Sequence, residues 1–382
     1  MVPARGHHRN QASLEKIINF SAPEPLTADQ RSETRDRFYA VINHFSATDR
    51  RDGYSRPLLV RYTFEYARSE LSQDIFLRAF FEFMNLGLTS DDDIDFDDDQ
   101  LDNGLTTFAD FLLDNFFLPL KASGHHTAQP SPAHLSVIQR AQGGIHEFTA
   151  TPDRLSVLRG ICLIRDRNRC VISRIFDQDE AISRLERHGN NARDDNGQLL
   201  LGEEFLTLEV AHILPHALTQ AKADSQLDDS KKAALMILNM FDFNVSHLIN
   251  GVDIDRPFNA ISLTQNLHGL FGKFKIFFEP VPGQEHTYRI DSCLPPGAVR
   301  AVPVTRTLYL TPDRSIEPPL PRLLAIHSAI CHILQLSGAG QYIDKILQDL
   351  EEIGTREDGS TDLGRLVNLR LGGWLDGAVD VH

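Results

Sequence analysis

Apolar residues recur at helical spacing through much of the first third of the chain. Stripes of this kind occupy residues 38–45, 75–86 and 105–118. Thr27-Ala-Asp-Gln30 precedes the first stripe and has the pattern of a capping box, in which a Thr and a Gln three residues later bond free backbone amides. Pro57 suits the first turn of another helix. The pattern predicts an all-helical domain over residues 26–122, after a polar arm at residues 1–25.

The hydrophobic pattern changes from about Arg154, where β-prone runs begin to alternate with polar segments. Phe205–Ala211 and Phe258–Leu263 are predicted strands, and a helix at about Ser230–Phe241 lies in the long connection between them. Thr264 can cap a further helix directly after the second strand. The expected order is therefore a strand, a long connection, a second strand and a helix.

The remaining runs are shorter or richer in proline. Further β-prone runs are Cys170–Ile172, Phe274–Phe278, His286–Ile290 and Arg306–Leu310. Asp177–Gly202 is polar and contains Asn190–Gly197, which is expected to be a loop. Pro295–Pro321 is rich in proline and should be extended, and Leu323–Ile353 has helical spacing. The chain thus predicts an α+β protein, in which a mixed domain lies between an N-terminal helical domain and a C-terminal helical tail.

Length and composition agree with several folded parts. The chain has 382 residues, enough for two or three domains, and 41% of them are hydrophobic, enough for more than one core. We divide it into an arm at 1–25, a helical domain at 26–122, a linker at 123–153, a mixed domain at 154–291, and an extended segment with a helical region at 292–382.

The charge of the chain limits the kinds of partner. The formal net charge is −15, whereas a protein that binds nucleic acid through a broad basic surface is usually basic, so any such contact must be local or the acidic residues must lie in another part of the chain. Much of the negative charge lies in Ser90–Asp102, whose alternating aspartates superficially match a calcium loop. Phe96 stands where that loop requires glycine, and Asp102 replaces the bidentate Glu, so we favour a solvated loop.

The cysteines and termini point to a reducing compartment. The four cysteines are scattered without a CxxC pair, which excludes a zinc ribbon and a dense disulfide framework. The first residues lack the apolar segment of a signal peptide, and no run approaches the roughly 18–20 apolar residues of a membrane span. We expect an intracellular protein, cytoplasmic or nuclear, with no membrane partner.

Three polar residues at the edges of apolar runs suggest chemistry. His212 ends the first predicted strand, Asn259 precedes the second, and His268 lies in the first turns of the following helix. A neutral imidazole is the natural base for activating water near pH 7, and a second imidazole can hold a cation. Singly, each residue is more commonly a core, turn or surface residue. Their joint order and spacing favour a hydrolytic site.

The residues around these three positions resemble the HNH endonucleases. The resemblance rests on Val210-Ala-His-Ile-Leu-Pro215, Asn259-Ala-Ile-Ser-Leu263, Leu267-His-Gly-Leu-Phe271 and the nine-residue step from Asn259 to His268. The match is best to the Ala-His-Ile-x-Pro variant that is common in fungal proteins, and it covers roughly residues 154–291. The resemblance implies a ββα-metal fold, phosphodiester hydrolysis and one divalent cation, Mg²⁺ or Mn²⁺ before Zn²⁺. It implies His212 as general base, Asn259 as positioning residue and His268 as metal ligand.

The chain departs from the family pattern in two ways. Many HNH enzymes place a metal-binding Asp directly before the base, where this chain has Ala211. Glu209 is our candidate for the second metal ligand because it shares a strand face with Ala211, and Asp255 and His216 are weaker candidates. Cys170 also lacks the partner that holds a structural zinc in many relatives.

The expected partners follow from the resemblance. We favour DNA over RNA as the substrate, and the N-terminal helical domain could bind a protein partner or a second copy of the chain. The alternative function is a catalytically degenerate HNH fold that serves as a protein- or nucleic-acid-interaction module.

Overall fold

The computed structural model describes most of the chain, including all of the predicted site. The described residues are 24–49, 53–89, 94–96, 99–124, 151–219, 228–351 and 363–375. Most of the predicted arm and linker, and residues 90–93 and 97–98 of the acidic run Ser90–Asp102, lie outside these ranges.

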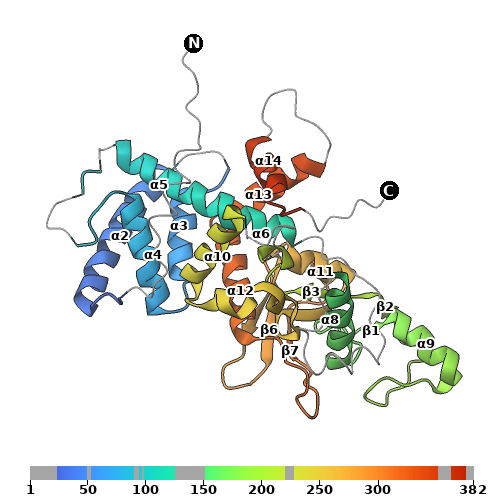
Figure 1. Ribbon diagram of the computed structural model, residues 1–382. Helices are drawn as coiled ribbons and strands as arrows, with labels where there is room; N and C mark the ends of the chain where they lie inside the picture. The colour runs from blue at the N-terminus through green and yellow to red at the C-terminus, as the bar shows by residue number, and fades with distance from the viewer. Residues whose placement is uncertain are drawn as a thin grey trace.

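The N-terminal part is helical, as the apolar stripes predict. Its elements are α2 (Ala28–Thr48), α3 (Arg56–Glu65), α4 (Glu70–Phe83), α5 (Asp99–Leu112), the π-helical turn η1 (Leu113–Phe117) and α6 (Leu118–Ser123) (Figure 1). The predicted capping box is confirmed, because the Gln30 amide donates to Thr27 Oγ1 and the Thr27 amide donates to Gln30 Oε1. Pro57 lies in the first turn of α3.

The middle part contains the predicted pair of strands and the helix after them. Its elements are α8 (Thr151–Arg165), β1 (Phe176–Asp177), α9 (Gln178–His188), β2 (Phe205–Leu206), β3 (Leu208–His212), η4 (His216–Leu218), α10 (Asp229–Phe241), η5 (Val245–Ile249), η6 (Gly251–Asp255), η7 (Pro257–Asn259), β4 (Ala260–Thr264) and α11 (Gln265–Gly272). β3 and β4 are antiparallel, with Leu208 opposite Thr264 and His212 opposite Ala260.

One helix in this part was not predicted, and one predicted strand is wrong. The polar stretch after Asp177 contains helix α9, which begins where the Asp177 carboxylate accepts a bond from the Glu180 amide. The helix is polar on average and Ala181 is the one buried residue among its described residues, so few apolar residues mark it in the sequence. Cys170-Val-Ile forms a turn instead of a strand, and its apolar side chains are buried while the Val171 amide bonds the Ser262 carbonyl of β4.

The C-terminal part adds a three-stranded sheet and helices. β5 (Ile276–Pro280), β6 (Thr287–Ser292) and β7 (Val304–Thr307) are antiparallel neighbours, and α12 (Pro321–Leu336), α13 (Ala339–Glu351) and α14 (Leu363–Leu371) follow. Among the described helices, none alone has the length and hydropathy of a membrane span; α12 and α13 meet that test only as a pair bent by 87°.

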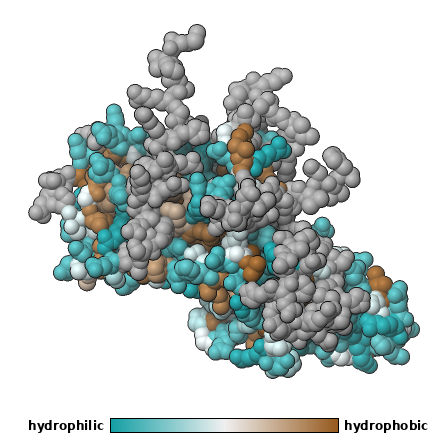
Figure 2. All heavy atoms as spheres, viewed as in Figure 1, coloured by the Kyte–Doolittle hydropathy of each residue, from teal (hydrophilic) through white to brown (hydrophobic). Residues whose placement is uncertain are grey.

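One hydrophobic core connects the three parts. Phe116 of η1 stacks on Phe241 of α10 with ring centroids 5.2 Å apart, and Trp374 and the apolar face of α12 belong to the same cluster. Hydrophilic side chains cover most of the described surface in view, with hydrophobic ones in smaller areas between them (Figure 2). The mixture of helices and small sheets agrees with the predicted α+β class. The boundaries of the five parts remain predictions.

Candidate active site

Strand β3 delivers His212 into the interior of the protein. The strand ends at this residue, and the histidine side chain is 1% exposed. An imidazole buried to this degree needs a partner for its polar atoms. Asp255, the last residue of the short helical turn η6, supplies one: its Oδ1 lies 3.1 Å from His212 Nε2.

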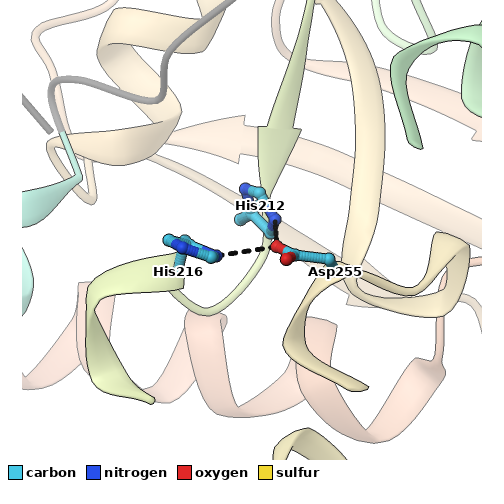
Figure 3. A group of neighbouring side chains, drawn as sticks. All are labelled: His212, His216 and Asp255. Atoms are coloured by element: carbon cyan, nitrogen blue, oxygen red, sulfur yellow. Dashed lines mark hydrogen bonds and ion pairs between the residues drawn. The ribbon is translucent and has the colours of Figure 1, made fainter. Parts of the chain in front are cut away.

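Asp255 is a shared partner at the centre of the site. His216, in the first turn of η4, brings Nδ1 to within 2.7 Å of the same Oδ1 atom, and both rings point toward Asp255 (Figure 3). Arg154 of α8 donates from Nε to the other oxygen, Oδ2, at 3.0 Å. Burial favours the neutral acid, but the bonds with His212 and His216 outweigh it and hold the pKa of Asp255 well below its usual range. Asp255 is therefore ionised at neutral pH.

The second ring nitrogen of His212 is free. Its Nδ1 is buried, and no described residue bonds it. Burial lowers the pKa of His212, and it outweighs the opposing effect of Asp255, so the ring is neutral near pH 7. A neutral imidazole that donates Nε2–H to Asp255 carries its lone pair on Nδ1. His212 Nδ1 is thus a basic nitrogen without a hydrogen-bond partner among the described residues.

Asn259 organises the loop that follows His212. Its Oδ1 accepts the Leu214 amide at 2.9 Å, and its Nδ2 donates to the carbonyls of Leu214 and Ile254 at 3.0 and 2.9 Å. Asn259 is fully buried, and these bonds tie the loop after β3 to the turn that carries Asp255. The side-chain amide of Asn259 therefore bonds the loop and not the ring of His212.

Glu209 and His268 form a separate pair. Glu209 Oε2 lies 2.7 Å from His268 Nδ1, which leaves His268 Nε2 without a described partner. Side chains alternate along a strand, so Glu209 faces α11 whereas Val210 packs with residues of α8. The two sequence candidates for metal ligands therefore lie together, on the α11 side of β3.

Only one group of three ligand-type side chains occurs in the described part of the chain. It consists of His212, His216 and Asp255, whose ligand atoms all lie within 4.8 Å of one another. Its donor set and spacing are compatible with a divalent cation. Glu209 and His268 do not belong to it, although His268 is near enough to contribute to the lowered pKa of His212.

Sequence reasoning ranked part of this site too low and missed another part. His216 and Asp255 were only weak candidates, although His216 is four residues after His212 and Asp255 four before Asn259. No local signal identifies Arg154, which approaches Asp255 from 101 residues away along the chain.

The comparisons with known proteins assign this region to a family. Residues 170–279 match the family model for HNH endonuclease. A comparison with curated proteins and one with solved structures each found no match. The matched segment includes β3, β4 and α11 and every residue of the site except Arg154, so the chain contains a domain of the HNH endonuclease family.

Proposed function

We propose that the protein is a metal-dependent HNH endonuclease that hydrolyses phosphodiester bonds in DNA, with His212 as the general base. The observation that carries the proposal is the state of the His212 ring. One nitrogen is held by Asp255 and the other has no partner among the described residues.

Asp255 prepares His212 to accept a proton. It bonds Nε2–H, and this fixes the tautomer in which the Nδ1 lone pair is available to a water molecule. A lowered pKa keeps that lone pair free at neutral pH. A positioned general base contributes about 10²- to 10⁴-fold to a rate. Asn259 holds the backbone of the loop and so limits the movement of both residues.

His268 and Glu209 fit the divalent cation that the family implies. His268 Nε2 has no described partner and would be the protein ligand, while Glu209, bonded to Nδ1 on the opposite edge of the ring, would orient the imidazole. Mg²⁺ commonly takes one or two protein ligands and fills its other positions with water and phosphate oxygens. When bound there, the cation would neutralise charge on the phosphate. We propose Mg²⁺ or Mn²⁺ in this position.

Nucleic acid remains the proposed partner of this acidic protein. Two cations near the site that could meet phosphate are already paired, Lys275 with Asp344 at 2.9 Å and Arg256 with Glu317. Contact with the nucleic acid would therefore be local, around the end of β3 and the start of α11. An intracellular location, and a protein partner or second copy on the helical part, are further proposals from the sequence.

A second candidate function is an HNH fold that binds without cleaving. Ala211 stands where many relatives have a metal-binding Asp, and the His212 side chain is 1% exposed, so a substrate phosphate has little access to the ring in this arrangement. This candidate and the endonuclease make opposite predictions for cleavage.

Plasmid nicking tests the proposal directly. Purified protein is incubated with supercoiled DNA and Mg²⁺ or Mn²⁺, with EDTA as a blank, and compared with His212→Ala, His268→Ala and the control His247→Ala, which changes an exposed residue. We expect cation-dependent nicking that falls at least about 100-fold for the first two variants and is unchanged for the control.

The outcomes separate the two candidates. Nicking by His212→Ala at the rate of the unchanged protein would exclude His212 as the base. An absence of nicking by the unchanged protein, together with retained DNA binding, would favour the non-cleaving fold.

A further inference from the structure

A second metal site can be built from the same residues that prepare the base. His212, His216 and Asp255 each offer one ligand atom within 4.8 Å of the others, and they come from three different elements, β3, η4 and η6. His212 Nε2 and His216 Nδ1 both face Asp255 Oδ1. The pair formed by Glu209 and His268 lies outside this group. The protein thus has two places for a cation, with different donors.

The donor set of the group selects a particular class of ion. Two imidazoles and one carboxylate suit Zn²⁺ and other borderline transition metals, whereas Mg²⁺ prefers oxygen ligands. In a tetrahedral zinc site with ligands about 2.0–2.1 Å from the ion, neighbouring ligand atoms lie about 3.3 Å apart. The present distances to Asp255 Oδ1, 3.1 and 2.7 Å, would have to open by about 0.2 and 0.6 Å to reach this spacing.

The surroundings of Asp255 suit a metal ligand. Only Oδ1 faces the two imidazoles, and Arg154 bonds Oδ2 at 3.0 Å. Carboxylates that bind metals are usually held by such an outer hydrogen bond. His216 is 17% exposed at its side chain, so the group is open to solvent on the His216 side although Asp255 is fully buried.

Metal binding in this group would remove the free base. A nitrogen binds a metal through its lone pair, so Nε2 of a neutral His212 must give up its proton. The ring keeps one proton in total, which then resides on Nδ1. His216 changes in the same way, from Nδ1–H to Nε2–H. With a proton on Nδ1, His212 has no lone pair left for water.

We propose that His212, His216 and Asp255 form an inhibitory site for a borderline transition metal such as Zn²⁺, distinct from the place of the activating cation at His268. The inhibitory part rests on the proposed function of His212 as the base, whereas the metal site itself does not. Zn²⁺ would thus switch off the nuclease by holding its base in the wrong tautomer.

Metal binding is measured first, without reference to activity. Metal-free protein is titrated with Co²⁺ and followed by its visible absorption, and Zn²⁺ affinity is obtained by displacement. We expect the unchanged protein to bind one ion tightly. The affinity should fall at least about 100-fold in His216→Gln. His216→Cys should still bind the ion and should show an added thiolate-to-cobalt charge-transfer band. The control His247→Gln changes an exposed histidine and should bind as the unchanged protein does.

Nicking then tests the inhibition. At a fixed concentration of Mg²⁺, each nicking rate is taken relative to that of the same protein without Zn²⁺. Added Zn²⁺ should stop nicking by the unchanged protein at concentrations that match its measured affinity, and at least about 100-fold more should be needed to inhibit the remaining activity of His216→Gln.

Three results would count against the proposal. Affinity that is the same in His216→Gln and in the unchanged protein would overturn the site. Stimulation of nicking by Zn²⁺ that is lost in His216→Gln would make the group the activating site and overturn inhibition. If no preparation nicks DNA, the proposed function and the inhibition fail together, while the Co²⁺ titration still decides the metal site.

Discussion

Two buried carboxylates, one in the helical part and one in the HNH domain, are held in similar ways but differ in what else they contact. Asp74 of α4 is fully buried and accepts Arg31 Nε at 2.7 Å, Arg31 Nη2 at 2.8 Å and the Leu26 amide at 2.9 Å. Asp255 is also fully buried and accepts Arg154, but its remaining partners are the rings of His212 and His216.

The difference lies in the chemistry of the partners. An arginine and a backbone amide keep their protons at every ordinary pH, so the Asp74 network can only join segments of chain. Imidazoles exchange protons near neutral pH, and His212 has a free nitrogen besides. Both carboxylates satisfy the same requirement, that a buried charge must be paired, but only one of them controls a reactive group.

The largest effect is expected for Asp255→Asn. The asparagine amide can donate to His212 Nε2, which favours the tautomer with a proton on Nδ1 and removes the base. Nicking should fall by about 10²- to 10⁴-fold. The rate is compared with that of Asp253→Asn, a change at a half-buried position in the same turn, after circular dichroism has established that both variants fold. A rate within threefold of the unchanged protein would contradict the role of Asp255.

Asp74→Asn should lower the stability of the protein and leave its nicking activity unchanged. The substitution leaves the Arg31 guanidinium without its buried counter-charge, and the free energy of unfolding should drop by about 2–4 kcal/mol. Nicking per folded molecule should not change, because no residue of the site contacts this network. Urea unfolding gives the stability. A loss of activity in fully folded protein would mean that the helical part takes part in catalysis.

Asn259→Ala is expected to lower both the stability of the protein and its nicking activity. The change leaves the buried amide and carbonyl of Leu214 without partners, which should cost about 3 kcal/mol of stability. The loop between His212 and His216 should loosen, and kcat should fall more than DNA affinity. Asn250→Ala, at an exposed position nearby, serves as the control and should cost no more than about 0.5 kcal/mol. A fully stable and fully active Asn259→Ala protein would contradict the positioning role.

The smallest expected effect is on the pH dependence of stability, and it comes from His327, a histidine outside the site. Burial lowers the pKa of His327 to about 3, from an ordinary value of 6.5. Below pH 6.5 the unfolded chain therefore binds a proton that the folded protein does not, and stability falls as the pH drops toward 3. At pH 5 the loss is about 2 kcal/mol.

His327→Phe keeps an aromatic ring against Phe271 but removes the titrating group. Urea midpoints between pH 7 and pH 5 should therefore depend less on pH in this variant than in the unchanged protein. His188→Gln, at an exposed position, serves as the control substitution. If the urea midpoint changes with pH equally in His327→Phe and in the unchanged protein, other groups are responsible for the acid sensitivity.

The sequence alone identified the elements that rest on local patterns. Helical spacing predicted α2 and α10, the capping box placed the start of α2, and the β-prone runs before His212 and after Asn259 predicted β3 and β4. The order and spacing of His212, Asn259 and His268 indicated the HNH family, which the family match to residues 170–279 supports. These signals are readable because they depend on neighbours within a few residues.

Tertiary structure decided how these residues are combined. Glu209 meets His268 on one side of β3, while His212 turns to Asp255 and His216 on the other side. Helix α8 adds Arg154, from outside the segment that matches the family. Spacing along the chain cannot specify these pairs, because burial and the packing of α8 and η6 against the end of β3 determine which polar atoms meet. The free nitrogen of His212, on which the proposed function rests, is visible only in the folded protein.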